Sequence, residues 1–234
     1  MSKTLLDELQ YYILPSANPS DDLKEIHNKT FDLWHGVWTN VFNELKFDTS
    51  NLEDDFIRQN LIVAICHKNI PVAVHLYSFF SMESKAARSH RYLKQFPETY
   101  FEKLKRFHVN TMMSLEYMTV HPEWRKGKVP VHIGSVLMGL SCKVLQHYKQ
   151  DASIAPARRD HKVHEVVYSV GGEPIISNVI NHNVPCDLLA IRKEKVKSHD
   201  SAEVQNTIER LWATRVECQN IFVPAYFETN KQAA

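Results

Sequence analysis

The spacing of apolar residues predicts a long helix near the N-terminus. Ser20 or Asp21 is a suitable N-cap, and apolar residues recur three or four positions apart after it. This stripe consists of Leu23, Ile26, Phe31, Trp34, Val37, Trp38, Val41, Phe42 and Leu45. Its aromatic residues indicate a face that packs into a core rather than one that lines a tunnel. Residues 1–19 before the cap are expected to form a loosely held lead-in.

Shorter apolar runs, rich in β-branched residues, predict the strands. Residues 61–66 and 70–80 are two such runs joined by a short polar link, a pattern typical of a hairpin. Further strands are expected at 112–120, 152–155, 175–179 and 186–191. The last two of these are expected to pair with each other.

Helical patterns fill the intervals between the strands. A charged insert at 81–108 is interrupted at Pro97, and a helix near 160–170 is followed by Gly171 and Gly172. Further helices are expected at 131–148 and 201–216. This order of elements predicts an α/β fold, with a mixed sheet and helices on both of its faces.

Composition narrows the class of protein. The chain has 234 residues, of which 44% are hydrophobic and 24% charged, so one elaborated domain with an ordinary core is expected. Its 28 basic and 27 acidic residues give a net charge of +1, which argues against nucleic-acid binding. No apolar run is long enough to span a membrane, and the first residues lack the pattern of a signal peptide. The four cysteines are widely spaced, which predicts reduced thiols in the cytoplasm.

Two motifs carry a resemblance to a known family. The stretch Tyr117–Met138 reads YMTVHPEWRKGKVPVHIGSVLM and resembles the acyl-donor motif of the GNAT acyltransferase superfamily. In that family a strand ending in V-x-P-x-x-R enters an R-x-x-G-x-G/A loop that opens a helix. The stretch Val166–Gly172 resembles the family's Y-x-x-x-G. The resemblance spans about 20–195, although its specific motifs occupy only 117–138 and 158–172. It implies a GNAT-like fold with a helical insert, followed by a C-terminal helix and tail at 196–234.

The chemistry of the donor loop also follows from its residues. A strand that feeds directly into a helix leaves about four N–H groups unpaired, which makes a site for phosphate. Arg125, Lys126 and Lys128 add positive charge, and Gly127 lets the backbone curl. The alternative is that these cations only mark an exposed helix start.

The loop departs from the family motif at two positions. Lys128 stands where the family has glycine, and Pro130 stands where it has glycine or alanine. Pro130 has no N–H to offer a pyrophosphate, although proline is also a favoured first residue of a helix. The phosphopantetheine of an acyl carrier protein presents a single phosphate, and the related N-acyl amino acid synthases and acyl-homoserine lactone synthases use such a donor. The donor is therefore either acyl-CoA or acyl carrier protein, and the insert would suit a bulky acyl chain.

The resemblance assigns two catalytic residues. Strand alternation would place Glu116, Met118 and Val120 on one face and Leu115, Tyr117 and Thr119 on the other. Glu116 is the candidate general base for the amine, and its alternative role is an ion pair with a neighbouring side chain. Tyr168 matches the tyrosine that protonates the leaving thiolate in some family members, and its alternative role is packing.

The donor-binding set comes from the same strand, loop and downstream motif. Backbone N–H groups of Met118, Thr119 and Val120 would polarise the thioester carbonyl. The complete set is Met118, Thr119, Val120, Arg125, Lys126, Gly127, Lys128, Val129, His132 and Arg159. His121 and His132 flank the loop and are alternative proton acceptors.

A second basic cluster, 158–162, precedes the helix that carries Tyr168. Asp160 is a suitable N-cap for that helix, and Arg158, Arg159 and Lys162 could reach the donor's phosphates or the acidic face of a carrier protein. The alternative is that these charges form an ordinary solvated face. His161 and His164 have a spacing that can hold a metal, but no further ligands match it, so no metal site is expected.

These observations together predict an N-acyltransferase. It would move an acyl group from an acyl thioester to the amine of a small molecule or amino acid by direct attack. The alternative is a non-catalytic module that binds an acyl thioester or a carrier protein. The sequence leaves the acceptor, the acyl length and the oligomeric state open.

Overall fold

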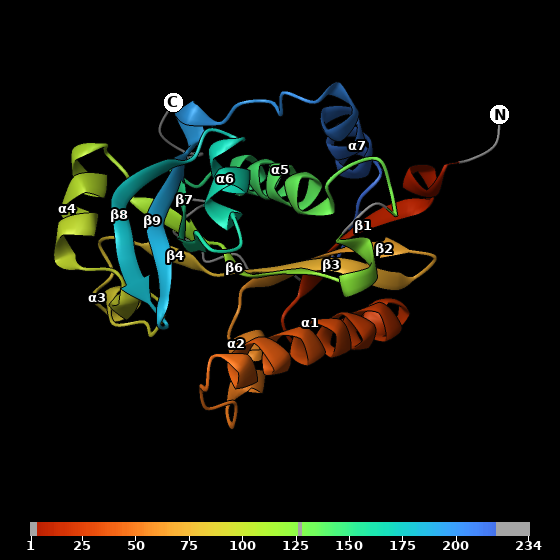
Figure 1. The fold of residues 1–234 in the computed structure, drawn as a ribbon, viewed down its shortest axis with the longest axis horizontal. Helices are drawn as coiled ribbons and strands as arrows, with labels where there is room; N and C mark the ends of the chain where they lie inside the picture. Colours follow the sequence, from red (N-terminus) through yellow and green to blue (C-terminus); the bar gives the residue numbers. More distant parts are fainter. Residues whose placement is uncertain (1–3, 126–127, 219–234) are drawn as a thin grey trace. The chain divides into compact units, whose positions relative to one another are not determined.

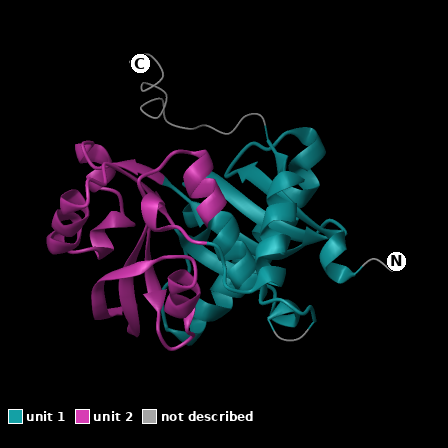
Figure 2. Cartoon of the chain, turned by 90° about the horizontal axis from the view of Figure 1, so that it is seen from above, with its two compact units in different colours: residues 1–78, 115–141, 198–221 teal, residues 79–114, 142–197, 222–234 magenta. Residues whose placement is uncertain are grey.

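The computed structural model describes residues 4–125 and 128–218. The chain folds into two compact units, each assembled from separate stretches of sequence (Figure 2). Among the described residues, the first unit contains 4–78, 115–125, 128–141 and 198–218, and the second contains 79–114 and 142–197. The chain therefore crosses from one unit to the other several times.

Five strands form the sheet of the first unit, here called sheet A. They are β1 (Leu9–Pro15), β2 (Leu61–His67), β3 (Ile70–Tyr77), β6 (Glu116–Val120) and β10 (Val216–Glu217). Their order is β10-β1-β2-β3-β6; β10 runs parallel to β1 and the other pairs are antiparallel. The predicted hairpin is confirmed as β2 and β3.

Strand β1 corrects the prediction of a loose lead-in at 1–19. All of its residues except Gln10 are buried, and it pairs with β2 along its whole length, from Leu9 opposite His67 to Pro15 opposite Leu61. Its run of large apolar residues lacks strict alternation because both faces of the strand are covered. The pattern was therefore present in the sequence but did not look like that of a half-exposed strand.

Helices cover both faces of sheet A (Figure 1). On one face lie α1 (Lys24–Glu44) and α2 (Leu52–Ile57), whose Trp34 and Phe56 pack with Val74 of the sheet. On the other face lies the first half of α5 (Ile133–His147), where Ser141 contacts the sheet. The helix α7 (Ala202–Ala213) begins at Ser201, whose hydroxyl caps it. The predicted helices at 20–45, 131–148 and 201–216 are confirmed within a few residues.

Five strands form the sheet of the second unit, here called sheet B. They are β4 (Phe79–Ser81), β5 (Thr111–Ser114), β7 (Ala152–Arg158), β8 (Glu173–Asn181) and β9 (Val184–Arg192). Their order is β4-β5-β7-β9-β8, with β5 parallel to β7 and the other pairs antiparallel. The short helix α6 (Val163–Tyr168) contacts β7 and β9.

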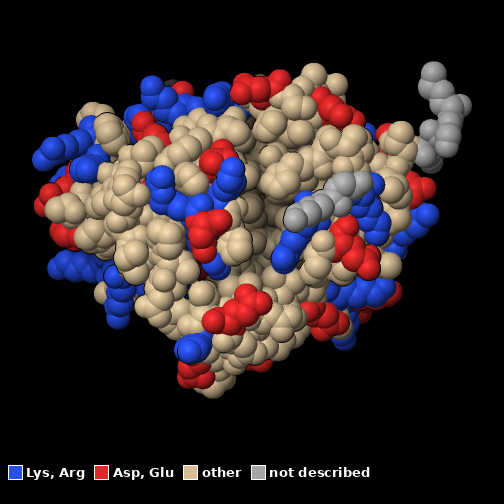
Figure 3. All heavy atoms as spheres, viewed as in Figure 1, with Lys and Arg blue, Asp and Glu red and all other residues tan. Residues whose placement is uncertain are grey.

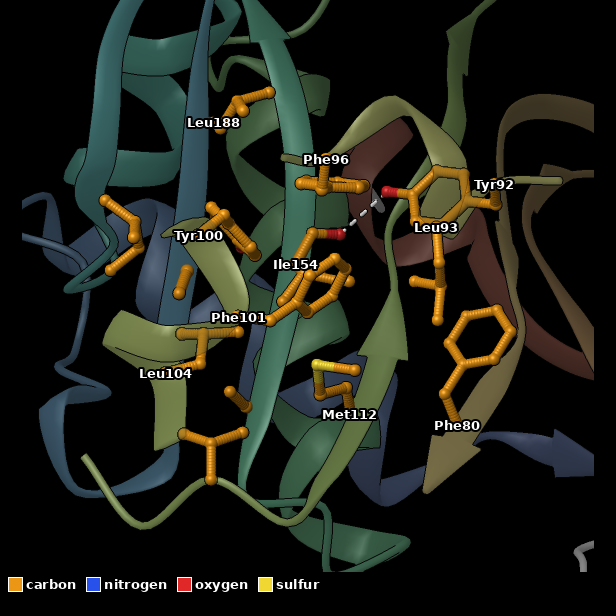
Figure 4. Close-up of a cluster of buried hydrophobic side chains, with 14 residues drawn as sticks. Phe80, Tyr92, Leu93, Phe96, Tyr100, Phe101, Leu104, Met112, Ile154 and Leu188 are labelled. Atoms are coloured by element: carbon orange, nitrogen blue, oxygen red, sulfur yellow. Dashed lines mark hydrogen bonds between the residues drawn. The ribbon is translucent and has the colours of Figure 1, made fainter. Parts of the chain in front are cut away.

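The predicted insert packs against sheet B as a closed aromatic core (Figure 4). It consists of α3 (Lys85–Arg88), a 3-10 turn (Leu93–Gln95) and α4 (Glu98–Arg106), which starts directly after Pro97. The hydroxyl of Tyr92 donates to the carbonyl of Ile154 at 2.9 Å, and that of Tyr100 donates to the carbonyl of Leu189 at 2.6 Å. The aromatic side chains that would suit an acyl chain are thus engaged in packing the insert onto its own sheet.

Three predicted elements differ from the structure. The single strand expected at 70–80 breaks at Ser78, so β3 belongs to sheet A and β4 to sheet B. The single strand expected at 112–120 breaks at Leu115, so β5 belongs to sheet B and β6 to sheet A. The helix expected from Asp160 begins later, at Val163, after Lys162 in the left-handed conformation (φ 57°). The carboxylate of Asp160 instead accepts hydrogen bonds from Arg158 and from the N–H of His161. A mixed α/β fold is confirmed, although its strands form two sheets rather than one.

Among residues 4–125 and 128–218, no helix combines the length and the apolar character that crossing a membrane requires. On the face drawn in Figure 3, basic and acidic side chains are interspersed, in keeping with the net charge of +1.

Candidate functional site

Strand β6 carries a bulge at Tyr117. Tyr117 has a positive φ of 58°, and the pairing of β6 with β3 shifts between Leu76–Glu116 and Val74–Thr119. Two residues of β6, Tyr117 and Met118, therefore lie opposite one residue of β3. The bulge overturns the predicted alternation, because Glu116 and Thr119 now share the face covered by α1 and α2.

Glu116 lies in an ion pair at this bulge. Its side chain is 2% exposed, and its Oε2 accepts from Arg58 Nη2 at 2.6 Å and from Gln59 Nε2 at 3.4 Å. Burial alone would lower the pKa of Arg58, but Glu116 and Asp55 raise that pKa above its usual value. The Glu116 carboxylate therefore lies in a buried ion pair with Arg58 and does not face open solvent.

The same network holds Tyr117. Its hydroxyl donates to Asp55, and its ring packs edge-on against Trp38 with centroids 4.9 Å apart. Burial, followed by the Asp55 carboxylate, raises the pKa of Tyr117 well above its usual value. Trp38 in turn donates to Thr119 Oγ1 at 2.9 Å. The aromatic stripe of α1 therefore packs against the site strand, as core.

The backbone of β6 offers donors at an open edge of its sheet. β6 is the end strand of sheet A. The N–H of His121 donates to Val72 in β3 at 2.8 Å. Because successive N–H groups of a strand alternate in direction, the N–H of Val120 points away from β3. This orientation is the one a carbonyl oxygen of a ligand would need.

The donor loop follows β6 directly. Arg125 is exposed, and its Nε donates to the carbonyl of Val120 at 2.9 Å, which ties the loop to the end of the strand. The ammonium of Lys128 lies 4.9 Å from the centroid of the Trp124 ring and 3.5 Å from Glu123 Oε2. Lys126 and Gly127 lie outside the described residues.

Apolar side chains anchor this loop to the unit. Trp124, Val129 and Val131 are each less than 8% exposed, so the predicted donor residue Val129 has its side chain in the core. Pro130 is exposed and precedes the helix by three residues, since α5 starts at Ile133. Pro130 therefore does not open the helix, and its missing N–H belongs to the loop.

His132 caps the start of α5. Its Nδ1 accepts the N–H of Ser135 at 3.2 Å and lies 3.0 Å from the Ser135 hydroxyl. A Cβ built on Gly134 would lie 2.8 Å from the His132 ring, so glycine is what lets the ring lie over the first turn. Burial, followed by the nearby His199, lowers the pKa of His132, which favours the neutral ring that a cap requires.

In the second unit, Tyr168 lies at the end of α6 beside a buried carboxylate. Its hydroxyl donates to Asp187 Oδ2 at 2.7 Å, and Arg159 Nη1 donates to the same oxygen at 2.7 Å. The other oxygen, Oδ1, accepts the N–H of Asn178 at 2.9 Å. Burial, followed by the hydrogen bond to Asp187, raises the pKa of Tyr168 to about 12.

The two histidines with metal-ligand spacing have separate environments. His161 is exposed, whereas His164 is buried, with its ring edge-on to Tyr168 and Nδ1 3.4 Å from the carbonyl of Arg158. Within the described part of the chain, no cluster of three or more His, Cys, Asp or Glu residues could hold a metal ion.

The predicted site residues fall into two sets. The first unit holds Glu116, Met118, Thr119, Val120, Arg125, Lys128, Val129 and His132, and the second holds Arg159 and Tyr168. The structure adds Arg58 and Asp187 as their charged partners. The sequence contained a signal that could have identified Asp187, because it is an acidic residue inside the apolar run 186–191. A carboxylate buried in such a strand requires hydrogen-bond partners. The sequence contained no such signal for Arg58.

No protein-family model and no curated protein sequence matches the chain. Solved structures, by contrast, are similar to it in fold, and they include the following three. FeeM, an N-acyl amino acid synthase from uncultured soil microbes, has a TM-score of 0.53 at 7% identity over 80% of this chain and 91% of its own. BjaI, a CoA-dependent acyl-homoserine lactone synthase solved with SAM and isopentyl-CoA, has a TM-score of 0.56 at 10% identity, over 96% and 100%.

An arylalkylamine N-acetyltransferase from Aedes aegypti has a TM-score of 0.52 at 11% identity, over 79% of this chain and 99% of its own. At such low identities the similarity establishes the fold and not the activity. The strands, the helices and the bulged strand that leads into α5 are thus arranged in the GNAT acyltransferase fold.

Proposed function

We propose that this chain is an N-acyltransferase that moves an acyl group from acyl-CoA to the amine of a small molecule. The observation that carries the proposal is the order of β6, Arg125, Lys128 and the start of α5 along the chain, in a protein with the GNAT fold. FeeM and the mosquito enzyme are named for N-acylation, and BjaI is described as CoA-dependent and bound to isopentyl-CoA.

The reaction would be direct attack of the amine on the thioester. The N–H of Val120, which points away from β3, would stabilise negative charge on the thioester oxygen, whereas the N–H of Thr119 faces β3. Glu116 would accept the proton of the amine, through a water because its carboxylate is held by Arg58. The electrons of the broken C–S bond would remain on sulfur, which would take a proton from Tyr168.

Arg125, Lys128 and the first turn of α5 would bind the donor's phosphates. His132 already accepts the N–H of Ser135, and Pro130 supplies no N–H, so fewer amides are available than in a glycine-rich loop. The Lys128 ammonium would compensate as a mobile point charge. An acyl carrier protein, with one phosphate, is the alternative donor, and the cytoplasm, inferred from the unpaired cysteines, is the proposed compartment.

The test is a thermal-shift titration with coenzyme A and acyl-CoAs of increasing chain length, followed by a turnover assay with an amine panel. Ligand-dependent stabilisation that grows with chain length, lost in Lys128→Ala and Arg125→Ala, supports the proposal. Lys24→Ala, which removes one positive charge from the exposed start of α1 far along the chain from the loop, serves as the matched charge control. No stabilisation at millimolar coenzyme A would reject it as donor, and binding of a carrier protein would then identify the alternative.

Binding without turnover would favour the non-catalytic module. In that case Tyr168→Phe would change nothing measurable, whereas in a transferase it should lower kcat with little effect on donor affinity.

A further inference from the structure

Asp187 is a buried charge to which the proposed reaction has not yet given a role. It lies in β9 with an exposed fraction of 0% and stands opposite Ala157 of β7. Its neighbours in sequence, Cys186 and Leu188, are buried as well. An ionised carboxylate in such surroundings is costly unless hydrogen bonds satisfy both of its oxygens.

Donors from three separate elements satisfy it. Tyr168 at the end of α6 and Arg159 before α6 share Oδ2, each at 2.7 Å. Asn178 donates its N–H to Oδ1 at 2.9 Å from within a bulge of β8, where it has a positive φ of 57°. Burial alone would raise the pKa of Asp187, but these three donors hold it below its usual value. The carboxylate is therefore a fixed, charged acceptor around which α6 and β8 are oriented.

We infer that Asp187 is a positioning residue that orients the Tyr168 hydroxyl and retains its proton until the leaving thiolate takes it. The inference rests on the proposed function, because it assumes that Tyr168 is the acid of an acyl transfer. A role in folding alone would need the carboxylate but not the phenolic proton.

The geometry permits this proton transfer. A phenol has one proton, which can swing about the Cζ–O bond, and in this structure it is directed at Asp187. When the proton turns to sulfur, the O–H bond of Tyr168 breaks, an S–H bond forms, and the phenolate regains a proton from water. Asp187 keeps Arg159 and Asn178 throughout, so it is not left as an unpaired buried charge.

In the described part of the chain, the titratable or charged side chains beside Tyr168 are Asp187, Arg159 and His164. Asp187 lies on β9 and Arg159 precedes α6, while the His164 ring lies edge-on at 5.5 Å within α6 itself. Of these three, Asp187 is the one that accepts the hydroxyl proton. Replacing this carboxylate by an amide of the same shape therefore isolates its effect.

The experiment compares wild type with Asp187→Asn. The titration of Tyr168 is followed by NMR of protein labelled at tyrosine Cζ, with Tyr168→Phe identifying the signal. We expect the pKa of Tyr168 to fall by about one unit or more toward its ordinary value near 10. We also expect kcat to fall about tenfold or more, with KM for the donor within about threefold of wild type. Asp160→Asn, which removes a nearby carboxylate bound to Arg158, should change neither quantity.

Two results would overturn this inference but leave the proposed function standing. One is a pKa of Tyr168 that does not change in Asp187→Asn. The other is that Asp187→Asn lowers kcat by the same factor in the wild-type protein and in Tyr168→Phe. If Asp187→Asn does not fold, wild type still decides, because a Tyr168 signal that titrates near an ordinary pKa of about 10 would contradict a retained proton. Absence of turnover in wild type would instead refute the proposed function, and the proton transfer with it.

Discussion

Burial of single titratable residues gives this protein a specific sensitivity to acid. His75 in β3 is 1% exposed, and its Nδ1 lies 3.0 Å from the Ser141 hydroxyl of α5. Burial lowers the pKa of His75 to about 3, below the 6.5 of an unfolded histidine. As pH falls through the interval between these values, the unfolded chain binds a proton that the folded chain does not, so stability is lost.

His75→Asn should remove this loss while keeping a polar partner for Ser141. Between pH 6.5 and pH 4 the free energy of unfolding of wild type should fall by about 3 kcal/mol more than that of the variant. Urea unfolding at a series of pH values measures the difference. Above pH 7 the difference between the two free energies of unfolding should not depend on pH. If this difference stayed constant down to pH 4, the proposed role of His75 would be contradicted.

Gly171 is a second residue with a defined structural demand. It has a φ of +97°, and a Cβ built on it would lie 1.9 Å from the carbonyl oxygen of Lys195. Gly171→Ala should therefore lower the free energy of unfolding by about 2–4 kcal/mol, from backbone strain and the clash. Gly36→Ala is the control, because nothing lies within 4 Å of its Cβ in α1.

The control should be stabilising by up to about 1 kcal/mol, since alanine is the better helix former. Equal effects of the two substitutions in urea unfolding would mean that the close approach at Gly171 relaxes at little cost. The Gly-Gly pair was predicted from sequence only as a helix end. That signal identifies a turn, but not the segment that crosses over it.

The residues of the candidate site were foreseen unevenly, for a physical reason. Glu116 and Tyr168 were proposed from motifs, because a motif identifies a residue by its position along the chain alone. Their partners Arg58 and Asp187 are 58 and 19 residues away in sequence. Such pairings are decided by tertiary packing, and a single sequence offers only the hint that a buried acid needs a partner.

At the scale of elements, long amphipathic patterns were reliable and local backbone breaks were not. Helix α1 matches its predicted range within a few residues because its periodicity runs over many residues, and the hairpin of β2 and β3 is present, although the run predicted at 70–80 divides at Ser78 into β3 and β4. The break at Leu115 and the bulge at Tyr117 leave no such signature, since Tyr117 adopts a positive φ without being glycine or asparagine. The bulge brings Glu116 to the face that Tyr117 and Thr119 share, and so decides where Glu116 points.

The start of α5 offers a test at this scale. His132→Ala should lower the free energy of unfolding by about 1 kcal/mol, because the Ser135 N–H loses its acceptor. His132→Asn should retain most of the stability, since its side-chain oxygen can cap the same N–H. Urea unfolding at pH 8 measures both variants. Alanine and asparagine variants of equal stability would show that the cap contributes nothing.

At the scale of the whole molecule, the chain is organised as two compact units with interleaved segments. Composition and length predicted one elaborated domain, and nothing in the hydrophobic pattern indicates where the chain crosses from one unit to the other. Each unit has its own sheet and its own buried core. The backbone amides that are best protected from opening should therefore lie in both sheets, with one protected region in each.

Hydrogen exchange followed by mass spectrometry tests this distribution. In sheet A, β2 lies between β1 and β3, and Leu61–Cys66 are 0% exposed, so its amides should exchange most slowly. In sheet B, β9 lies between β7 and β8 and should be the slow strand. β8 is the matched comparison, because it pairs with β9 but forms the edge of sheet B, and its Ile180 is 72% exposed. If β8 peptides were as protected as β9 peptides, the edge of sheet B would have to be covered by another part of this chain or by a second copy.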